Sequence, residues 1–246
     1  MPLNTDPTFQ PSSSTNTRSP IPARIVDCVL AAVGLIILSP VLCLISLIVW
    51  QGGLPVFFRQ TRVGQNEKRF KLLKFRSMYP DSNGDFITAS TDHRVTPIGK
   101  ILRRYKLDEL PQLWNVLKGD MSILGPRPEV PAFVDPQNPR WIKVLSVRPG
   151  ITGVASLLLR NEEQILARVS DREEYYCSVL LPLKLWLETT YLLERNFWGD
   201  VKLVVLTLRY SFFPSGFDSE QIYRSLFGGS SNGEGQQKQV SLRRPQ

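Results

Sequence analysis

The chain has 246 residues, 42% of them apolar, and its 30 basic and 22 acidic side chains give a formal net charge of +8, which suits anionic lipid, phosphorylated substrates or nucleic acid. The single histidine, His93, disfavours a His-based catalytic triad and a multi-histidine metal site, and three cysteines make no even disulfide framework, as expected of a reducing, cytoplasmic setting. The sequence has no zinc-finger spacing, RRM-like aromatic motif or clear helix-turn-helix, so we expect no nucleic-acid partner.

The two ends of the chain have the composition of disordered segments. Residues 1–22 are rich in Ser, Thr, Pro and Asn and show no apolar period, and residues 228–246 are similarly polar. We therefore predict a disordered N-terminal extension over 1–22 and a disordered tail over 228–246. Between them we expect a membrane helix over 23–52 and a cytoplasmic or interfacial domain over 53–213.

The apolar segment over residues 25–50 contains one charge, Asp27. As a straight helix, the uncharged run after Asp27 would reach roughly 35 Å, which is enough to cross a hydrocarbon core of ~30 Å. The segment is too long for a cleaved signal peptide, and no small-residue cleavage pattern follows it. We therefore predict a membrane helix, with the core helix of a soluble protein as the alternative.

Ser39-Pro40, at the centre of this segment, predicts a bend. Proline removes one backbone donor and clashes with the preceding turn, and the Ser39 hydroxyl can bond back to a carbonyl one turn earlier. Both flanks are basic, with Arg24 before the segment and Arg59 and Arg62 among the cations after it, and such residues normally lie on the cytoplasmic side. A helix that bends and returns to the same face fits both flanks, and a kinked spanning helix remains an alternative.

Short elements are expected next. Residues 56–58 and 70–75 are typical of strands around a turn at 64–66, and residues 80–92 are polar and loop-like. Thr96-Pro97 provides an N-cap and a first helical residue for a short helix.

Asp108 and Glu109 are adjacent carboxylates at the expected start of an amphipathic helix over 108–117. The positive end of a helix favours an ionised carboxylate by ~0.3–1 kcal/mol, and the nearby cations Arg103 and Lys106 act in the same direction. An ionised Asp108 could attack phosphorus or hold Mg²⁺, with Glu109 as a base or an orienting partner. The alternative is an ordinary capping pair.

Gly125-Pro126-Arg127-Pro128 is a second candidate motif. The prolines Pro126 and Pro128 fix the backbone around Arg127, so its guanidinium is presented with little entropy to lose and can bind phosphate in a bidentate manner. Arg103 could neutralise a pyrophosphate or anionic lipid headgroups. A rigid structural turn is the alternative explanation of the motif.

The C-terminal part of the chain combines helical patterns with aromatic and basic side chains, as in helices that lie in a membrane interface. An ordinary aromatic core is the alternative. The patterns fall near residues 129–135, 162–181, 183–195 and 199–212. In and beside the last two of them lie the aromatic residues Trp186, Phe197, Trp198, Tyr210, Phe212 and Phe213.

Over roughly residues 24–210 the chain resembles the bacterial sugar transferase family, the monotopic polyprenyl-phosphate phosphoglycosyl transferases. Several motifs in the same order carry the resemblance. They are Arg24-Ile-Val-Asp27, Ser39-Pro40, and the segments 55–64, 74–78, 94–99, 107–113, 115–122, 125–128 and 148–153. The resemblance implies an α+β, mostly helical fold with a re-entrant membrane helix broken at Ser39-Pro40, interfacial amphipathic helices and a small β element.

The resemblance also implies a reaction and roles for residues. Asp108 would be the nucleophile and a Mg²⁺ ligand, Glu109 its partner, and Arg127 in its Pro-Arg-Pro turn a nucleotide contact, with Arg103 supporting phosphate binding. A UDP-sugar would give its sugar-1-phosphate to Asp108, UMP would leave, and polyprenyl (undecaprenyl) phosphate would accept the phosphosugar. This is the first membrane step of surface glycan synthesis, such as that of exopolysaccharide, capsule or O-antigen.

The expected place is the bacterial inner membrane, with the catalytic domain on the cytoplasmic face against anionic lipids of the inner leaflet, as a monomer or a homodimer. No run of further membrane helices precedes the core, so the chain is similar to the minimal members of the family. It departs from the family pattern at residues 65–67, which lack the usual glycine-rich turn, and at 155–159, which lack a polar run. An acidic family residue before Tyr175-Tyr176 could correspond to Asp171, Glu173 or Glu174.

Two other functions are weighed. A glycosyltransferase would move the sugar alone and release UDP, but the chain lacks a second nucleotide-binding βαβ unit. A catalytically inactive membrane adaptor would use the basic surface to recruit partners, but it would have no need of the Asp108-Glu109 pair and Arg127.

Overall fold

The computed structural model describes residues 21–53, 55–80, 87–90, 92–213 and 216–227. In this part of the chain the fold is α+β and mostly helical, which confirms the predicted fold class. The predicted disordered segments lie outside it, except for residues 21 and 22, which begin the first helix two residues before its predicted start.

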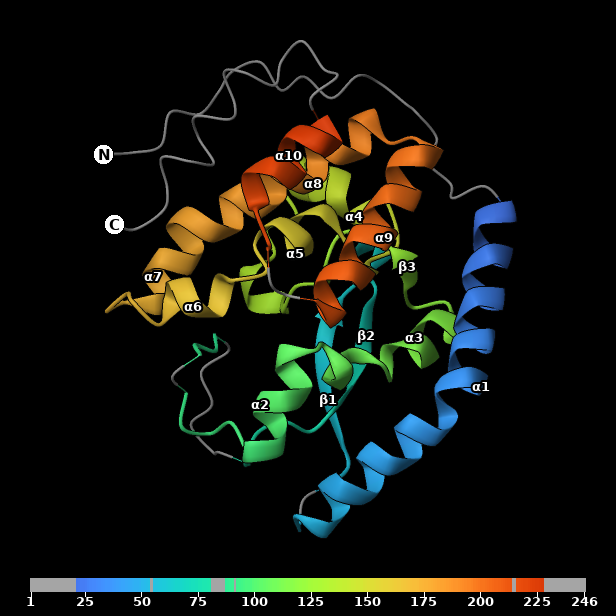
Figure 1. Ribbon diagram of the computed structural model, residues 1–246. Coiled ribbons are helices and arrows are strands. Elements are labelled where there is room, and N and C mark those ends of the chain that lie inside the picture. The colour runs from blue at the N-terminus through green and yellow to red at the C-terminus, as the bar shows by residue number, and fades with distance from the viewer. Residues whose placement is uncertain (1–20, 54, 81–86, 91, 214–215, 228–246) are drawn as a thin grey trace.

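The described elements alternate short strands with helices and end in a helical layer. They are α1 (Ile21–Gln51), β1 (Phe57–Val63), η1 (Gln65–Glu67), β2 (Arg69–Phe75), α2 (Pro97–Arg104), η2 (Leu107–Glu109), α3 (Gln112–Lys118), β3 (Ser122–Leu124), η3 (Pro131–Phe133), α4 (Pro139–Leu145), β4 (Gly150–Thr152), α5 (Val154–Leu158), α6 (Glu162–Leu166), α7 (Arg172–Tyr175), η4 (Tyr176–Leu180), α8 (Leu181–Glu194), α9 (Phe197–Phe212) and α10 (Ser219–Phe227). Figure 1 shows α1 along one edge, the β1–β2 hairpin near the centre and α8 and α10 above it.

The predicted hairpin is present. β1 and β2 pair antiparallel from Phe57 opposite Phe75 to Val63 opposite Arg69. The turn lacks glycine at its tip, and instead Asn66 and Glu67 take left-handed backbone angles with φ of 52° and 62°. Asn adopts this region more readily than most residues do, so the missing glycine changes the residue at the turn and leaves the hairpin intact.

A second sheet was not predicted. β3 and β4 form a parallel pair with Ser122 opposite Gly150. The backbones approach so closely that a Cβ on Gly150 would lie 2.1 Å from the nitrogen of Gly125, which only glycine allows. The pair thereby joins the Gly-Pro-Arg-Pro turn to the segment 148–153 and fixes the backbone that carries Arg127.

α1 is one bent helix with Pro40 inside it. The Ser39 hydroxyl donates to the carbonyl of Ile36 at 2.8 Å, the back-bonding that was predicted. In Figure 1 the helix axis changes direction about halfway along. Residues Ala23–Gln51 make the one helical stretch in the described ranges that is long and apolar enough to cross a membrane. Ile36 and Ile37 are 72% and 69% exposed, so the alternative of a buried core helix is wrong.

Both halves of α1 pack on the same body. Near its start, Arg24 donates to two carbonyls at the C-terminal end of α3, the nearer at 2.7 Å. The Asp27 carboxylate accepts from the Ser122 hydroxyl of β3 at 2.7 Å, which explains the one charge in the apolar segment. Near its end, Val49 is buried in a cluster with Phe75 of β2. The bent helix is thus held to one body at both of its halves.

The helix predicted over 108–117 is wrong at its start. Residues 107–109 form the 3-10 turn η2, and α3 begins only at Gln112. Pro111 has no N–H to donate to the carbonyl of Leu107, so an α-helical ladder cannot run through it from η2. Lys106, with φ of 58°, reverses the chain just before the turn. Asp108 and Glu109 therefore lie in a tight turn and not in the first turn of an α-helix.

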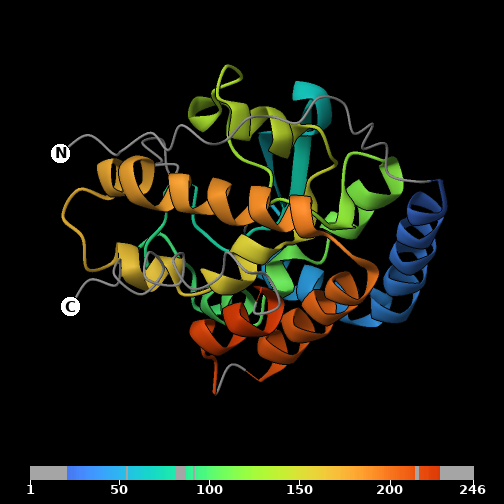
Figure 2. The same cartoon turned by 90° about the horizontal axis from the view of Figure 1, so that it is seen from above.

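Some aromatic residues of the C-terminal helices are buried in the core, and others are exposed on the surface. α8 packs in the largest apolar cluster, and Tyr210 is buried. Phe197, Trp198, Phe212 and Phe213 of α9 and its end are all more than half exposed. Figure 2 shows α8 and α9 as separate layers of the molecule. The surface description therefore applies to the aromatic residues at the two ends of α9, and the core description applies to α8 and to Tyr210 of α9.

Two other helical patterns are shorter than predicted. Near 129–135 only the 3-10 turn η3 forms, and the pattern near 162–181 is divided into α6, α7, η4 and the start of α8. Asp171 interrupts the predicted helix because it is the N-cap of α7. Its carboxylate accepts from the N–H of Glu174 at 2.9 Å, so α7 begins there as a separate helix.

Candidate active site

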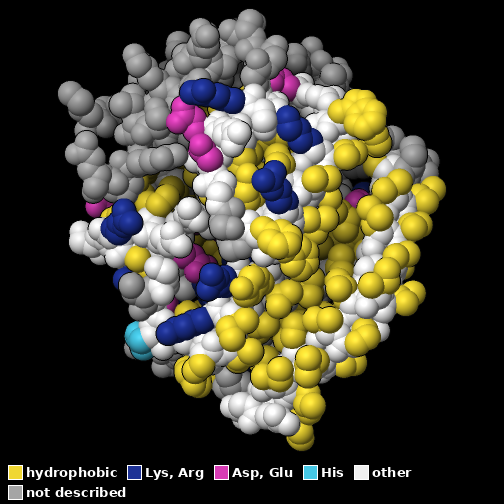
Figure 3. Space-filling view, in the orientation of Figure 1, with side chains coloured by type: hydrophobic (Ala, Val, Ile, Leu, Met, Phe, Trp, Pro, Cys, Tyr) yellow, Lys and Arg dark blue, Asp and Glu magenta, His cyan; other side chains and the backbone are white. Residues whose placement is uncertain are grey.

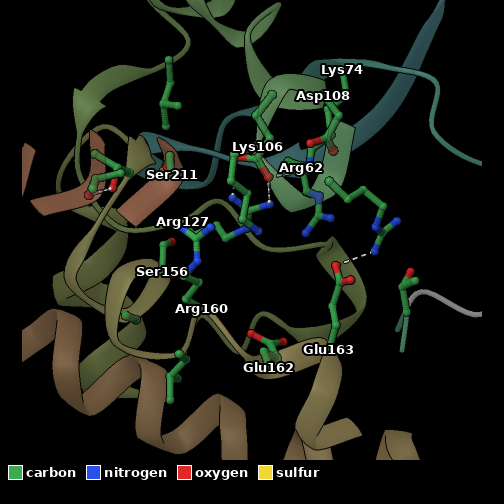
Figure 4. A pocket seen from close by; sticks show the side chains of 18 of the residues that line it. Arg62, Lys74, Lys106, Asp108, Arg127, Ser156, Arg160, Glu162, Glu163 and Ser211 are labelled. Carbon is green, nitrogen blue, oxygen red and sulfur yellow. Dashed lines mark hydrogen bonds and ion pairs between the residues drawn. The ribbon is translucent and has the colours of Figure 1, made fainter. Parts of the chain in front are cut away.

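A cavity of about 1100 Å³ lies between the β1–β2 hairpin, η2, the Gly-Pro-Arg-Pro turn and the C-terminal helices. Asp108, Glu109, Arg103, Pro126 and Arg127 all line it. Figure 4 shows Asp108 and Lys74 on one wall, with Arg127, Ser156 and Arg160 toward the other and Glu162 and Glu163 across the space. The sequence-predicted residues are thus brought together from three separate segments. Pro128, unlike these residues, does not line the cavity. Its carbonyl accepts from Arg62 at 3.1 Å and holds the turn in place.

Glu109 is bound on two sides by cations. Arg127 donates to both of its carboxylate oxygens, at 3.1 and 2.7 Å, and Lys74 donates at 3.1 Å. Burial acts to raise the pKa of Glu109, but Arg127 and Lys74 outweigh it and hold that pKa well below its usual range. Glu109 is therefore an ionised anchor that orients Arg127, and its bonds leave it poorly placed to take up a proton as a base.

Asp108 is buried and free. It is 6% exposed, and its Oδ1 has no hydrogen-bond partner among the residues that the structure describes. Burial raises the pKa of Asp108, and Lys74 offsets part of this effect. The expectation that helix position and neighbouring cations would favour the ionised form is therefore outweighed by desolvation. An unpaired buried carboxylate that lines a cavity is available to a ligand. A cation or an electrophile bound there would supply the partner that its oxygen lacks.

The residues fit one Mg²⁺ ion only if a ligand contributes. No cluster of three or more His, Cys, Asp or Glu suited to a metal occurs in the described part of the chain. The unpartnered Oδ1 of Asp108 offers one oxygen, whereas both oxygens of Glu109 accept from Arg127. Mg²⁺ commonly takes one or two carboxylates and completes its shell with substrate phosphates and water, so this donor set suits it.

Most cations that line the cavity are already paired. Arg103 bonds to Glu163, and Lys184 pairs with Glu162 at 2.8 Å. Lys106 and Arg160 have no ion pair among the described residues, and burial lowers the pKa of Arg160, as expected for a cation without a carboxylate. These two unpaired cations are available to a ligand phosphate. The Ser156 hydroxyl, buried and without a partner among the described residues, adds a further hydrogen-bonding group.

A buried network on the hairpin side was missed by the sequence reasoning. The Tyr176 hydroxyl donates to Glu129 at 2.5 Å, and Arg62 pairs with the other oxygen of the same carboxylate at 3.0 Å. The ammonium of Lys184 lies 4.6 Å from the centre of the Tyr176 ring. The paired tyrosines were the one signal in the sequence. Asp171, Glu173 and Glu174, the acids considered beside them, do not line the cavity, whereas Glu129 does.

Glu188, at the far wall, makes stability depend on pH. Its carboxylate accepts from the Ala155 N–H at 3.1 Å, and burial raises its pKa to about 7. Because the pKa of Glu188 is higher in the folded protein, its protonated carboxyl contributes fully to the free energy of unfolding below the unfolded pKa of about 4.5. That contribution is lost as the pH rises through 7.

We expect Glu188→Gln to stabilise the protein at high pH. Glutamine keeps an acceptor for Ala155 and cannot ionise, so the free energy of unfolding should match the parent near pH 4 and exceed it by up to about 3 kcal/mol at pH 8. Denaturant unfolding at the two pH values measures the difference. An equal difference at both would mean that Glu188 does not titrate in the folded protein.

Comparison with known proteins gives a consistent result. The model of the family described as bacterial sugar transferase matches residues 19–214. A UDP-glucose:undecaprenyl-phosphate glucose-1-phosphate transferase of Escherichia coli is 40% identical over 196 residues, which are 75% of this chain and 39% of that protein. Galactosyl transferase CpsE of Streptococcus agalactiae is 33% identical over 80% of this chain and 43% of its own length. The exopolysaccharide production protein ExoY of Rhizobium meliloti is 35% identical over 62% of this chain and 75% of its own. The chain spans about two fifths of the first two relatives.

Proposed function

The chain belongs to the bacterial sugar transferase family, and on that premise we propose that it moves a sugar-1-phosphate from a UDP-sugar to polyprenyl phosphate in the synthesis of a surface glycan. Relatives are named for UDP-glucose and undecaprenyl phosphate. The observation that carries the proposal is the unpartnered buried carboxylate of Asp108, in a cavity whose cations suit phosphate. A carboxylate so placed is suited to covalent catalysis on phosphorus.

In the first half-reaction, a carboxylate oxygen of Asp108 attacks the phosphorus that bears the sugar. A new P–O bond forms to Asp108, and the bond from this phosphorus to the bridging oxygen of the diphosphate breaks. The bridging oxygen keeps the electron pair and leaves as part of UMP. Because the pKa of Asp108 is raised by burial, the nearby cations Lys74, Lys106 and Arg103 are needed to favour its ionised, nucleophilic form.

In the second half-reaction, a phosphate oxygen of the polyprenyl phosphate attacks the same phosphorus. The new P–O–P bridge forms while the bond to Asp108 breaks, and the carboxylate is restored. Arg127, held by Glu109, and the unpaired Arg160 stabilise the charge that develops on the transferred phosphate. Mg²⁺ on Asp108 and the substrate phosphates would supply further charge neutralisation.

The nucleotide that is released tests the reaction. Purified protein in detergent, with Mg²⁺, polyprenyl phosphate and a panel of UDP-sugars, should release UMP with its own donor. UDP would instead indicate transfer of the sugar alone, and no release from any donor by folded protein would favour an adaptor.

We further propose that α1 is a re-entrant helix in the bacterial inner membrane, with the catalytic cavity on the cytoplasmic side against anionic lipids. Two observations support this: both halves of α1 pack on the same body, and its outer face is apolar and exposed. Reporters fused to the two ends of the chain should both be protected from external reagents in intact cells. An externally labelled C-terminal reporter beside a protected N-terminal one would show that α1 spans the membrane.

A further inference from the structure

The cavity has two chemically different regions. One holds the charged side chains around Asp108, and the other is an apolar arm between α1 and α9. Figure 3 shows an apolar hollow between the long helix at the edge of the molecule and the helices beside it. The arm is lined from three sides, by Leu30, Gly34 and Leu38 of α1, Ile123 and Ile151 of β3 and β4, and Val204, Leu208 and Phe212 of α9.

The arm is continuous with an exposed apolar surface. Leu30, Leu208 and Phe212 line it and are also more than half exposed, so the same side chains belong to the cavity wall and to the outer face. On the α1 side the wall lies in the run from Cys28 to Trp50, which has no charge. The arm thus connects a surface suited to lipid with the phosphate-binding end of the cavity.

The position of α9 against the sheet is fixed by a polar contact. The hydroxyl groups of Thr152 in β4 and Thr207 in α9 lie 2.8 Å apart, and both residues line the cavity. The Thr207 hydroxyl also donates to the carbonyl of Leu203 one turn earlier. This contact joins α9 to β4 at the wall of the cavity.

We propose that this apolar arm binds the first isoprene units of the polyprenyl phosphate acceptor and directs its phosphate toward Asp108. The assignment rests on the proposed function, which requires an acceptor that is apolar along its chain and anionic at one end. That polarity matches the cavity, whose uncharged arm opens to the apolar face and whose other end carries Lys106, Arg127 and Arg160. The volume of about 1100 Å³ also exceeds the roughly 300–1,000 Å³ typical of a site for one small ligand.

Two matched pairs of positions test the arm. On α9, Leu208 and Val205 are 55% and 56% exposed, but only Leu208 lines the cavity. On α1, Leu30 and Val29 are 53% and 54% exposed, and only Leu30 lines it. Leu208→Trp and Leu30→Trp place a large side chain in the arm, whereas Val205→Trp and Val29→Trp add similar bulk to the outer face.

We expect each arm variant to raise the KM for a C55 polyprenyl phosphate about tenfold, which corresponds to the loss of burial of one or two methylene groups. A C10 prenyl phosphate, whose two isoprene units are the ones proposed to lie in the arm, should show a similar increase in KM. The single-turnover burst of UMP without acceptor serves as the reference for the first half-reaction. Equal KM increases in the outer-face variants, or an unchanged KM in both arm variants, would overturn the assignment.

A direct readout separates this assignment from the proposed reaction. A C55 polyprenyl phosphate with a photoreactive diazirine in its first isoprene units should label peptides of α1 and α9 that include Leu30 or Leu208. Labelling confined to other peptides would contradict the arm while a UMP burst still supported the reaction. A parent protein that forms no UMP at all would remove the proposed function, and with it the acceptor that this site is argued to hold.

Discussion

Asp108→Asn is expected to abolish phosphosugar transfer, with a loss on the order of 10⁴-fold or more, as when the nucleophile of a covalent enzyme is removed. The amide of asparagine is not a nucleophile toward phosphorus, and Asp108 is the one carboxylate of the pair whose oxygens are not taken up by Arg127 and Lys74. The UMP burst without acceptor and the complete reaction should both disappear, because both depend on the same covalent step.

Folding should survive this change. Burial already disfavours the charged form of Asp108, and its Oδ1 has no partner to lose, so the thermal midpoint should stay the same or rise. Asp135→Asn, at an exposed position outside the cavity lining, is the matched control and should keep full activity. Full transfer by well-folded Asp108→Asn protein would show that another group is the nucleophile.

Glu109→Gln is expected to destabilise the protein by about 3 kcal/mol and to impair transfer severely. The change leaves Lys74 and Arg127 without their shared counter-charge in a buried site, and breaking a buried pair from one side typically costs ~3–5 kcal/mol. The lower figure applies here because Arg127 is about one third exposed, at 32% of its side chain. Thermal or denaturant unfolding in detergent measures the change.

The matched control is Glu220→Gln, which alters an exposed ion pair with Arg224 one helical turn away. Surface pairs of this kind contribute little, so stability should change by less than about 0.5 kcal/mol. If Glu109→Gln were as mild as this control, the carboxylate would not be the anchor of Arg127 that its two hydrogen bonds indicate.

Much of the fold could be predicted because its signals are local. The uncharged run of α1, the proline in its middle and the Thr96 cap each act within a few residues of chain. The Thr96 hydroxyl accepts from the Gly99 N–H at 2.9 Å, as its sequence position predicts. The hairpin is also local, because its two strands are neighbours in the sequence and are joined by a short turn.

What was missed depends on contacts between distant segments. β3 and β4 have three residues each and lie more than twenty residues apart, so neither carries a readable pattern of its own. The Arg62–Glu129–Tyr176–Lys184 network joins three segments that only the tertiary fold brings together.

The sequence predicted residues that the fold brings to one cavity, but it did not predict the electrostatics of that cavity. Sequence neighbours place Arg103 and Lys106 beside Asp108, and this favours ionisation. Burial has the opposite and larger effect on the pKa of Asp108, and burial is a property of the folded cavity that no local pattern reveals. The different roles of Asp108 and Glu109 could not be predicted either, because only the fold shows that Arg127 bonds to Glu109 and not to Asp108.

The central claim is that Asp108 carries the phosphosugar during transfer. The most direct measurement is mass spectrometry of the protein after brief exposure to its UDP-sugar and Mg²⁺ without acceptor, followed by acid quenching and peptide analysis. We expect a sugar-phosphate adduct on the peptide that contains Asp108, absent from Asp108→Asn and removed when polyprenyl phosphate is added. An adduct on another residue, or acceptor-dependent UMP release with no adduct at any time, would contradict it.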